Sequence, residues 1–482
     1  MPSCMQHVMV RSNETITKKR HMNFHAYYRD VKPVTACLIG TGDFGNSFIA
    51  QTERMERVTT RLAVDLDAAR AARAFAASGV DPARIAVCAT AAEARTAWEA
   101  GKAIATSEPA LAADLPVDII VEATGDPEGG ARHARLAIEA DKHLVMVSKE
   151  ADSLIGPGIA AMAADRGRIV TPVDGDQPSL LIGLVTWAET LGFEILAAGK
   201  SSEYDFVFDS ASETIDSNGR VINVAGFAAL DRLGTRDVSD AVAERSRLAA
   251  ALPQKLVPDL CEMTLVSNHT GLMADRPDLH VPIARIEELP TLFALAADGG
   301  LLSAGRRIDV FQCLRAPHEL SFAGGVFVVV RCIHEATWKL LAHKGHVLSR
   351  DGSTALLWLP RHLLGLEAAT SVLDAAGLGV SSGAVTPAPH TDLVMHADRD
   401  FAAGEVLTMG GHHHEVADAS ARMIPAAPLS AEAPAPFYLV SNRTLVRPVA
   451  KGDLFRLADV EIDPASELLA LRQAQDARFF PG

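Results

Sequence analysis

Short apolar runs alternate with longer, alanine-rich or amphipathic stretches between residues 31 and 150. Runs of this length and composition are typical of strands that are buried on both faces of a parallel sheet. The stretches between them have the length and spacing of helices. This alternation predicts a doubly wound parallel α/β sheet. The predicted strands lie at 34–39, 62–64, 85–87, 117–123 and 143–147.

The pattern is less regular after residue 153 and changes again near residue 391. Apolar runs at 169–173, 193–200 and 326–330 predict further strands, and 346–385 is expected to be a helical connector. Short β-prone runs between polar turns then predict a small β domain, closed by an amphipathic helix over 466–478. The expected parts are a flexible extension (1–30), a dinucleotide-binding Rossmann domain (31–172), an α/β substrate and dimerisation domain (173–390) and a small C-terminal β domain (391–482).

A glycine-rich turn follows the first predicted strand, with Gly40, Gly42 and Gly45 in the pattern GxGxxG. A helical stretch follows this turn, and the next strand ends at Asp65, about twenty residues past Gly45. The glycines allow the backbone to approach a pyrophosphate at the helix N-terminus. The cofactor-binding candidates in this motif are Gly40, Gly42, Asp43, Phe44, Gly45 and Asp65.

Asp65 is expected to accept hydrogen bonds from the adenosine ribose and to repel a 2′-phosphate, which favours NAD over NADP. Arg70 and Arg73 lie close in sequence and leave NADP open. Thr124 and Gly125 follow the strand at 117–123, at the edge of the sheet where ligands bind in such folds. We therefore expect them to line the nicotinamide ribose.

The candidate catalytic side chains are Lys149, Lys200, Asp176 and Glu150. Lys149 follows a strand at the nicotinamide end of the sheet, and a lysine with a lowered pKa, or a water held by one, can move a hydroxyl proton. Lys200 ends another strand and could clamp a substrate carboxylate or phosphate, although it could equally be a surface lysine.

Two acidic strand ends, one containing Glu150 and Asp152 and the other Asp174 and Asp176, could orient substrate hydroxyls or bind a divalent cation. The alternative is that these carboxylates cap helices and turns; we favour a turn role for Asp174 and substrate contact for Asp176. The metal ligands stay unknown, and a divalent metal is not indicated. Residues 412–414 are three consecutive histidines, for which a solvated turn is favoured over a metal site.

Composition excludes several classes of function. The net charge of −15 argues against binding of nucleic acid, which requires a basic face. The six cysteines are scattered without a CxxC pair, as in a reduced cytoplasmic protein. No apolar stretch is long enough for a membrane span. Residues 1–30 have no apolar signal core and are expected to be a flexible extension, within which Met22 is an alternative start. The expected partners are a small-molecule substrate and further copies of the chain.

The chain resembles the homoserine dehydrogenase-like NAD(P)-dependent oxidoreductases with a C-terminal SAF (β-clip) domain, over about residues 30 to 480. LIGTGDFGNSFIAQ, VDIIVEATGDPEGG and KHLVMVSKEADSLIGPG carry the resemblance in the Rossmann part. VDGDQPS, FEILAAGK, LVPDL and GGVFVVV carry it in the middle of the chain. HADRDFAAGEVL and RPVAKGDL are similar to the two SAF turns. A role of the SAF part as a lid or an oligomer contact is a further hypothesis.

The resemblance implies hydride transfer between nicotinamide and a small, polar, anionic hydroxy or oxo compound, such as a sugar phosphate, sugar acid or polyol. One branch of the family resembles 1-deoxy-D-xylulose 5-phosphate reductoisomerase, from which Asp65 and Lys149 depart. Lys149 instead resembles the strand-end lysine of homoserine dehydrogenases, although no ACT-type regulatory region is evident. The alternatives are therefore a reductoisomerase-like enzyme, a homoserine dehydrogenase and a non-catalytic NAD-binding sensor.

Overall fold

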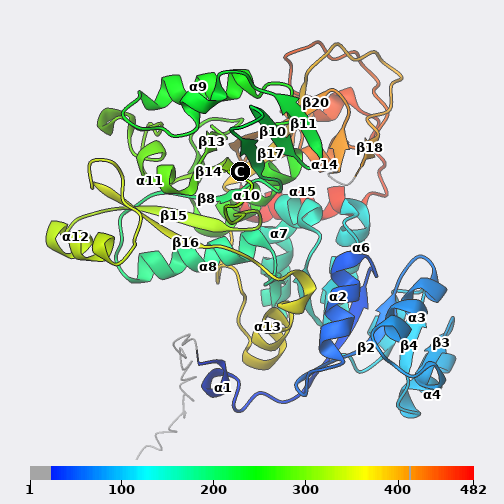
Figure 1. Cartoon of the computed structure of the whole chain (residues 1–482). Helices are drawn as coiled ribbons and strands as arrows, with labels where there is room; N and C mark the ends of the chain where they lie inside the picture. The colour runs from blue at the N-terminus through cyan, green and yellow to red at the C-terminus, as the bar shows by residue number, and fades with distance from the viewer. Residues whose placement is uncertain (1–22, 412–413, 482) are drawn as a thin grey trace, which may run out of the picture.

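The computed structural model describes residues 23–411 and 414–481. A seven-stranded sheet in the order β3-β4-β2-β1-β5-β6-β7 forms the first part, and all of its strands are parallel. The doubly wound sheet predicted from the apolar runs is confirmed (Figure 1). Its strands are β1 (Val34–Ile39), β2 (Val58–Val64), β3 (Ile85–Val87), β4 (Ala103–Thr106), β5 (Ile119–Glu122), β6 (His143–Met146) and β7 (Val170–Pro172).

Both faces of this sheet are buried, because successive strand residues point to opposite sides. Cys37 and Ile39 of β1 lie in one core cluster, whereas Ala36 and Leu38 lie in another. The first cluster includes residues of α4 (Ala91–Glu99), α5 (Leu111–Asp114), α6 (Pro127–Glu139) and α7 (Lys149–Ala164). The second includes residues of α2 (Asp43–Thr52), α3 (Ala68–Ala77) and α13 (Ala369–Val372). Helices thus cover both faces of the parallel sheet.

The second part is a mixed nine-stranded sheet, ordered β11-β10-β9-β14-β8-β15-β16, with β12 and β13 also paired to β14. Its strands are β8 (Ile195–Ser201), β9 (Phe206–Asp209), β10 (Thr214–Ser217), β11 (Arg220–Asn223), β12 (Met273–Ala274), β13 (Ile283–Ala284), β14 (Arg307–Arg315), β15 (Val326–Arg331) and β16 (Thr354–Leu359). The helices of this part are α8 (Gln177–Thr190), α9 (Val238–Leu248), α10 (Val257–Thr270), α11 (Leu289–Leu292) and α12 (Glu335–His343).

The expectation of a helical connector over 346–385 is wrong for its first half. Residues 354–359 form β16, which pairs antiparallel with β15 over six residues. Local leucine content favours a helix here, but pairing with the buried β15 overrides that preference. The later residues are helical, and 364–378 return to the Rossmann part, where Tyr28 donates to Asp374 at 2.9 Å.

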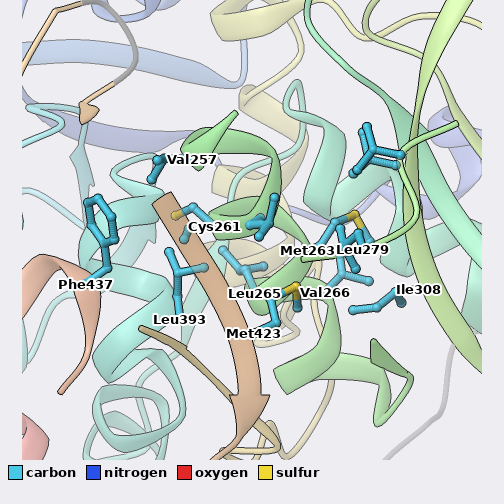
Figure 2. Close-up of a cluster of buried hydrophobic side chains, with 14 of the residues drawn as sticks. Val257, Cys261, Met263, Leu265, Val266, Leu279, Ile308, Leu393, Met423 and Phe437 are labelled. Carbon is cyan, nitrogen blue, oxygen red and sulfur yellow. The ribbon is translucent and has the colours of Figure 1, made fainter. Parts of the chain in front are cut away.

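The C-terminal region, residues 391–481, contains two small sheets, as the pattern predicted. One pairs β17 (Thr391–Ala397) with β20 (Ala419–Pro425), and the other pairs β18 (Met409–Gly410) with β19 (Glu415–Val416). Figure 2 shows that Leu393, Met423 and Phe437 share a buried cluster with α10. The identification of this region as a SAF domain stays a prediction.

The last helix, α15 (Glu467–Phe479), packs on α6 and α7 of the Rossmann part rather than within a separate C-terminal unit. Gln475 accepts from the backbone N–H of Gly158 at 2.8 Å. Arg472, fully buried, pairs with Asp392 at 2.6 Å and with Asp476 at 2.7 Å. The contacts of α15 and Gln475 tie the C-terminal region to the Rossmann part, and the Arg472 pairs hold the region itself together. Among the described residues, no helix combines the length and apolar character needed to cross a bilayer.

Candidate active site

The glycine-rich turn between β1 and α2 is shaped by close backbone contacts. Gly40 has a φ of +98°, and a Cβ there would collide with the carbonyl oxygen of Ala123. A Cβ on Gly45 would collide with the carbonyl oxygen of Gly40. Gly42, by contrast, has no atom within 4 Å of a built Cβ and precedes α2 without a side-chain cap. The open side of the turn therefore faces the N-terminus of α2, where backbone N–H groups and the helix dipole favour an anion.

Two more predicted cofactor residues begin α2. Asp43 is exposed at the first position of the helix, and Phe44 is half-buried at the second. The backbone oxygen of Phe44 lies so close to Gly365 that a side chain there would collide with it. The returning segment after β16 thus packs against the start of the cofactor helix.

Asp65 follows β2 and faces the glycine-rich turn. Its carboxylate accepts from the Thr41 N–H at 3.0 Å and from the Thr41 hydroxyl, and the Arg70 Nε lies 3.7 Å away. Burial of this side chain, which is 10% exposed, favours the neutral form, but the hydrogen bonds and Arg70 outweigh it and lower the pKa of Asp65. A fixed, ionised carboxylate at this position can accept hydrogen bonds from ribose hydroxyls. The turn and Asp65 together fit a dinucleotide.

Thr124 and Gly125 lie at the carboxyl end of β5, as predicted. The N–H and hydroxyl of Thr124 donate to Glu122 at 3.2 and 2.5 Å. Gly125 has a φ of +71°, and its N–H donates to the hydroxyl of Ser148 at 2.8 Å. Ser148 directly precedes Lys149, the first residue of α7. The ends of β5 and β6 are thereby held side by side.

Lys149 lies at the centre of a cluster of charged side chains at this edge. Its ammonium group donates to Glu262 of α10 and lies 3.5 Å from Asp176, which precedes α8. The side chain of Lys149 is 25% exposed, whereas that of Glu262 is 5% exposed. Lys149 is therefore held by carboxylates from two helices while part of it remains open to a ligand.

The expectation that Lys149 has a lowered pKa is wrong. Burial disfavours the ammonium form, but the carboxylates of Asp176, Glu262 and Glu150 outweigh this effect and hold the pKa of Lys149 well above its usual value. In this cluster Lys149 is a charged proton donor rather than a neutral base.

The interpretation of Lys200 as a surface lysine is also wrong. It is 3% exposed, and its ammonium group pairs with Asp259 at 2.8 Å and with Glu262. Burial favours protonation of Glu262, but Lys149 and Lys200 on either side lower its pKa to about 2. Because Lys200 already contacts two buried carboxylates, it is not available to clamp a substrate anion.

The carboxylates at the two acidic strand ends make different contacts. Asp176 accepts from the Gln177 N–H at 2.9 Å, as a helix cap does, and also faces Lys149. Asp174 is bonded to Ser179 and, at 2.7 Å, to Thr370. Asp152 is buried, and burial raises its pKa to about 7. In the part of the chain that the structure describes, no three His, Cys, Asp or Glu side chains are grouped to hold a metal ion.

Glu150 brings a residue of the C-terminal region into this cluster. Its carboxylate oxygen lies 2.7 Å from Nδ1 of His414. The expectation of a solvated turn is therefore wrong for His414, whose side chain is 33% exposed and paired. A hydrogen bond to an ionised carboxylate is stronger than one between neutral groups, so the contact with Glu150 stabilises the imidazole in this position. His412 and His413 lie outside the described residues.

Sequence reasoning missed three members of the site, Glu262, Asp259 and His414. Asp259 and Glu262 are three residues apart in the first half of α10, where their neighbours Leu260, Cys261 and Met263 are apolar. Two carboxylates on one turn of a buried helix need cationic partners, and this spacing was the available signal. No comparable local pattern indicates the contact that His414 makes.

Two family models match the chain. Residues 40–170 match the NAD-binding domain of homoserine dehydrogenase, and residues 175–368 match the catalytic domain of oxidoreductase DRL. No curated protein matches the chain by sequence. The two matches place the glycine-rich turn and Lys149 in one domain and Lys200 and Glu262 in the other. The chain carries both domains and is an NAD(P)-dependent oxidoreductase.

Several solved structures are similar in part. One is myo-inositol dehydrogenase from Lactobacillus casei, in complex with NAD(H) and myo-inositol, which is 13% identical with a TM-score of 0.26. The match covers 37% of this chain and about half (47%) of the length of that dehydrogenase. GenD2 from gentamicin A biosynthesis, in complex with NAD, is 14% identical (TM-score 0.33; 72% of this chain, 88% of that chain). The 1-deoxy-D-xylulose 5-phosphate reductoisomerase from Zymomonas mobilis, in complex with NADPH, is 16% identical (TM-score 0.30; 49% of this chain, 58% of that chain). These likenesses are too low to carry a function over to this chain.

Proposed function

We propose that this oxidoreductase, with its homoserine dehydrogenase-type NAD-binding domain and its DRL catalytic domain, transfers a hydride between nicotinamide and a small hydroxy or oxo compound, with Lys149 as the group that carries the proton. The observation that carries the proposal is the position of Lys149: charged, partly open, and at the carboxyl ends of β5 and β6. Ligands of doubly wound sheets bind at this edge.

The raised pKa of Lys149 supports a role as proton donor. When bound, nicotinamide supplies or accepts the hydride at its C4. In reduction, the Lys149 ammonium donates a proton to the carbonyl oxygen of the substrate as the carbon gains a hydride, which gives the alcohol and a neutral amine. Asp176, whose carboxylate is 3.5 Å from the Lys149 ammonium and whose side chain is 17% exposed, can return a proton from solvent. In oxidation, the Lys149 ammonium first loses a proton through Asp176, and the neutral amine then accepts the proton of the substrate hydroxyl.

The charges around Lys149 favour a substrate rich in hydroxyl groups at its reacting end. Four carboxylates (Glu150, Asp176, Asp259 and Glu262) face two lysines, so that the cluster is acidic overall. Carboxylates accept hydrogen bonds from hydroxyls and repel anions. We propose a polyol, a sugar acid or a sugar phosphate whose hydroxyl-bearing end contacts Lys149 and whose anionic group, where it has one, lies away from this cluster.

We propose NAD as the cofactor. Arg70 and Arg73, the two residues that could meet a 2′-phosphate, face carboxylates instead: Arg70 is 3.7 Å from Asp65, and Arg73 is 3.2 Å from Asp67. A 2′-phosphate beside the ionised Asp65 would be repelled. We further expect a homo-oligomer, for which light scattering of the purified protein is the measurement.

The experiment is nicotinamide-dependent turnover of the full chain, followed by absorbance. NAD and NADP forms are tested against polyols, sugar acids, sugar phosphates, homoserine and 1-deoxyxylulose 5-phosphate. Turnover of a polyol or sugar derivative with NAD(H) supports the proposal. Turnover of homoserine alone, or rearrangement of 1-deoxyxylulose 5-phosphate, assigns one of the alternative enzymes. Cofactor binding with no turnover on any of these compounds favours a sensor and contradicts the role of Lys149.

A further inference from the structure

His414 lies in the β18–β19 segment of the C-terminal region and contacts the cofactor-binding part at two places. Its Nδ1 is 2.7 Å from the Glu150 carboxylate, across 264 residues of sequence. Its ring also covers Gly125, because a methyl group built on Gly125 would lie 2.8 Å from Cε1 of the imidazole. The imidazole therefore rests on backbone at the end of β5 and is fixed from the side by Glu150.

The charged groups around His414 hold its ring in one position. The charged groups that face the ring are Glu150 and Lys149 of α7 and Asp126, which precedes α6. The hydrogen bond and charge of Glu150 outweigh burial and the Lys149 charge, and they raise the pKa of His414. A ring that is two-thirds buried and held by a carboxylate has little freedom to turn away.

We infer that His414 forms a wall of the cofactor site, against which the nicotinamide ribose binds, and that Glu150 holds it in place. The inference rests on the proposed function, because it requires a dinucleotide that extends from Gly42 to Gly125. An imidazole next to the Gly125 backbone offers a polar edge to ribose hydroxyls and a flat face to the nicotinamide. The C-terminal region thereby supplies a residue that the two matched domains lack.

Binding of three nucleotides to the full chain tests the inference without turnover. ADP reaches only the part of the site formed by the glycine-rich turn and Asp65, ADP-ribose adds the second ribose, and NADH adds the nicotinamide. The affinities are measured by calorimetry for the wild type and for His414→Ala. We expect ADP to bind both proteins equally, and ADP-ribose and NADH to bind the variant about five- to tenfold more weakly, as loss of about one hydrogen bond predicts.

The matched control is His396→Ala, because His396 also pairs with a carboxylate, Asp398, at 3.0 Å in the C-terminal region. This control should bind all three nucleotides as the wild type does. Glu150→Gln keeps the shape of the side chain but loses its charge. It should weaken the binding of ADP-ribose by a smaller factor than His414→Ala does. Unchanged or tighter binding of ADP-ribose by His414→Ala would overturn the inference. Failure of ADP to bind the wild type would instead overturn the cofactor site itself.

Discussion

Lys149 donates to Glu262 across 113 residues of sequence. Lys149 begins α7 in the NAD-binding domain, whereas Glu262 lies on α10 in the catalytic domain. This ion pair therefore joins the two domains at the point where strand ends and α10 meet. On its other side Glu262 contacts Lys200, so that one carboxylate pairs with two ammonium groups.

Glu262→Gln tests that arrangement. The variant removes the negative charge between two lysines, one of which is buried, and leaves them facing each other. Removal of one partner from a buried ion pair costs about 3–5 kcal/mol, and we expect a loss of unfolding free energy of this order. The pKa of Lys149 should also fall, which would move the alkaline limb of the pH–rate profile to lower pH.

The measurements for Glu262→Gln are urea unfolding and the pH dependence of turnover. Glu194→Gln is the control, because Glu194 pairs with Arg331 at 2.8 Å on the surface, where such pairs contribute about 1 kcal/mol or less. Equal stability losses in the two variants would contradict the account of Glu262.

Gly42→Ala separates cofactor binding from folding. Gly42 has a φ of −73° and no atom within 4 Å of a built Cβ, so alanine fits the protein alone. In the complex, the added methyl group would stand where the pyrophosphate approaches. We expect unchanged thermal stability and at least about tenfold weaker ADP binding by calorimetry. Gly183→Ala, in helix α8 with equally open surroundings, should affect neither; unaltered ADP affinity in Gly42→Ala would place the cofactor elsewhere.

The preference for NAD is tested with Asp65→Ser. The serine retains a hydroxyl for the ribose but removes the charge that opposes a 2′-phosphate, and it frees Arg70, now 3.7 Å from Asp65. We expect the ratio of kcat/KM for NAD over NADP to fall by about 10- to 100-fold, the effect of about 1–3 kcal/mol. A wild-type enzyme that already prefers NADP, or a variant with an unchanged ratio, would show that Asp65 does not select the cofactor.

The sequence predicted the parts of the molecule that depend on local pattern. Buried strands such as β5, the turn at Gly42 and the acidic end of β2 follow from apolar runs, glycine spacing and one carboxylate. β16 was missed because its leucines match a helix as well as a strand, and only the pairing with β15 decides between them.

The chemistry of the site was less accessible from the sequence, because it depends on contacts between distant segments. The raised pKa of Lys149 depends on Asp176 and on Glu262, and the buried Lys200 depends on Asp259 as its partner. Glu262 and Asp259 both lie on α10. His414 reaches Glu150 from 264 residues away. Such long-range pairs leave at most an unexplained polar residue in an apolar helix as a local signal.

Asp152→Asn gives a pH-dependent prediction for stability. The carboxyl of Asp152 is 4% exposed, and its Oδ2 has no hydrogen-bond partner in the described part of the chain. Its pKa rises from 3.8 to about 7, so that the folded state holds this proton more tightly than the unfolded state. Stability from this group is therefore lost as pH rises through that range.

The neutral amide of Asp152→Asn should remove this loss. In urea unfolding, we expect the free energy of unfolding of the variant, relative to that of the wild type, to increase between pH 4 and pH 8. The increase should reach up to about 4 kcal/mol at the higher pH. Asp165→Asn, at the exposed end of the same helix and paired with Arg478, is the control and should show no such gain. A constant difference between Asp152→Asn and wild type across this pH range would mean that Asp152 is ionised throughout.

The most direct test of the central claim is Lys149→Ala, assayed for turnover and for NADH binding in the same preparation. Lys339→Ala, on the exposed face of α12, is the control. The account predicts that turnover falls by about 10²- to 10⁴-fold while NADH binds within about twofold of the wild type. Turnover within about tenfold of the wild type, with NADH bound, would contradict Lys149 as the group that carries the proton.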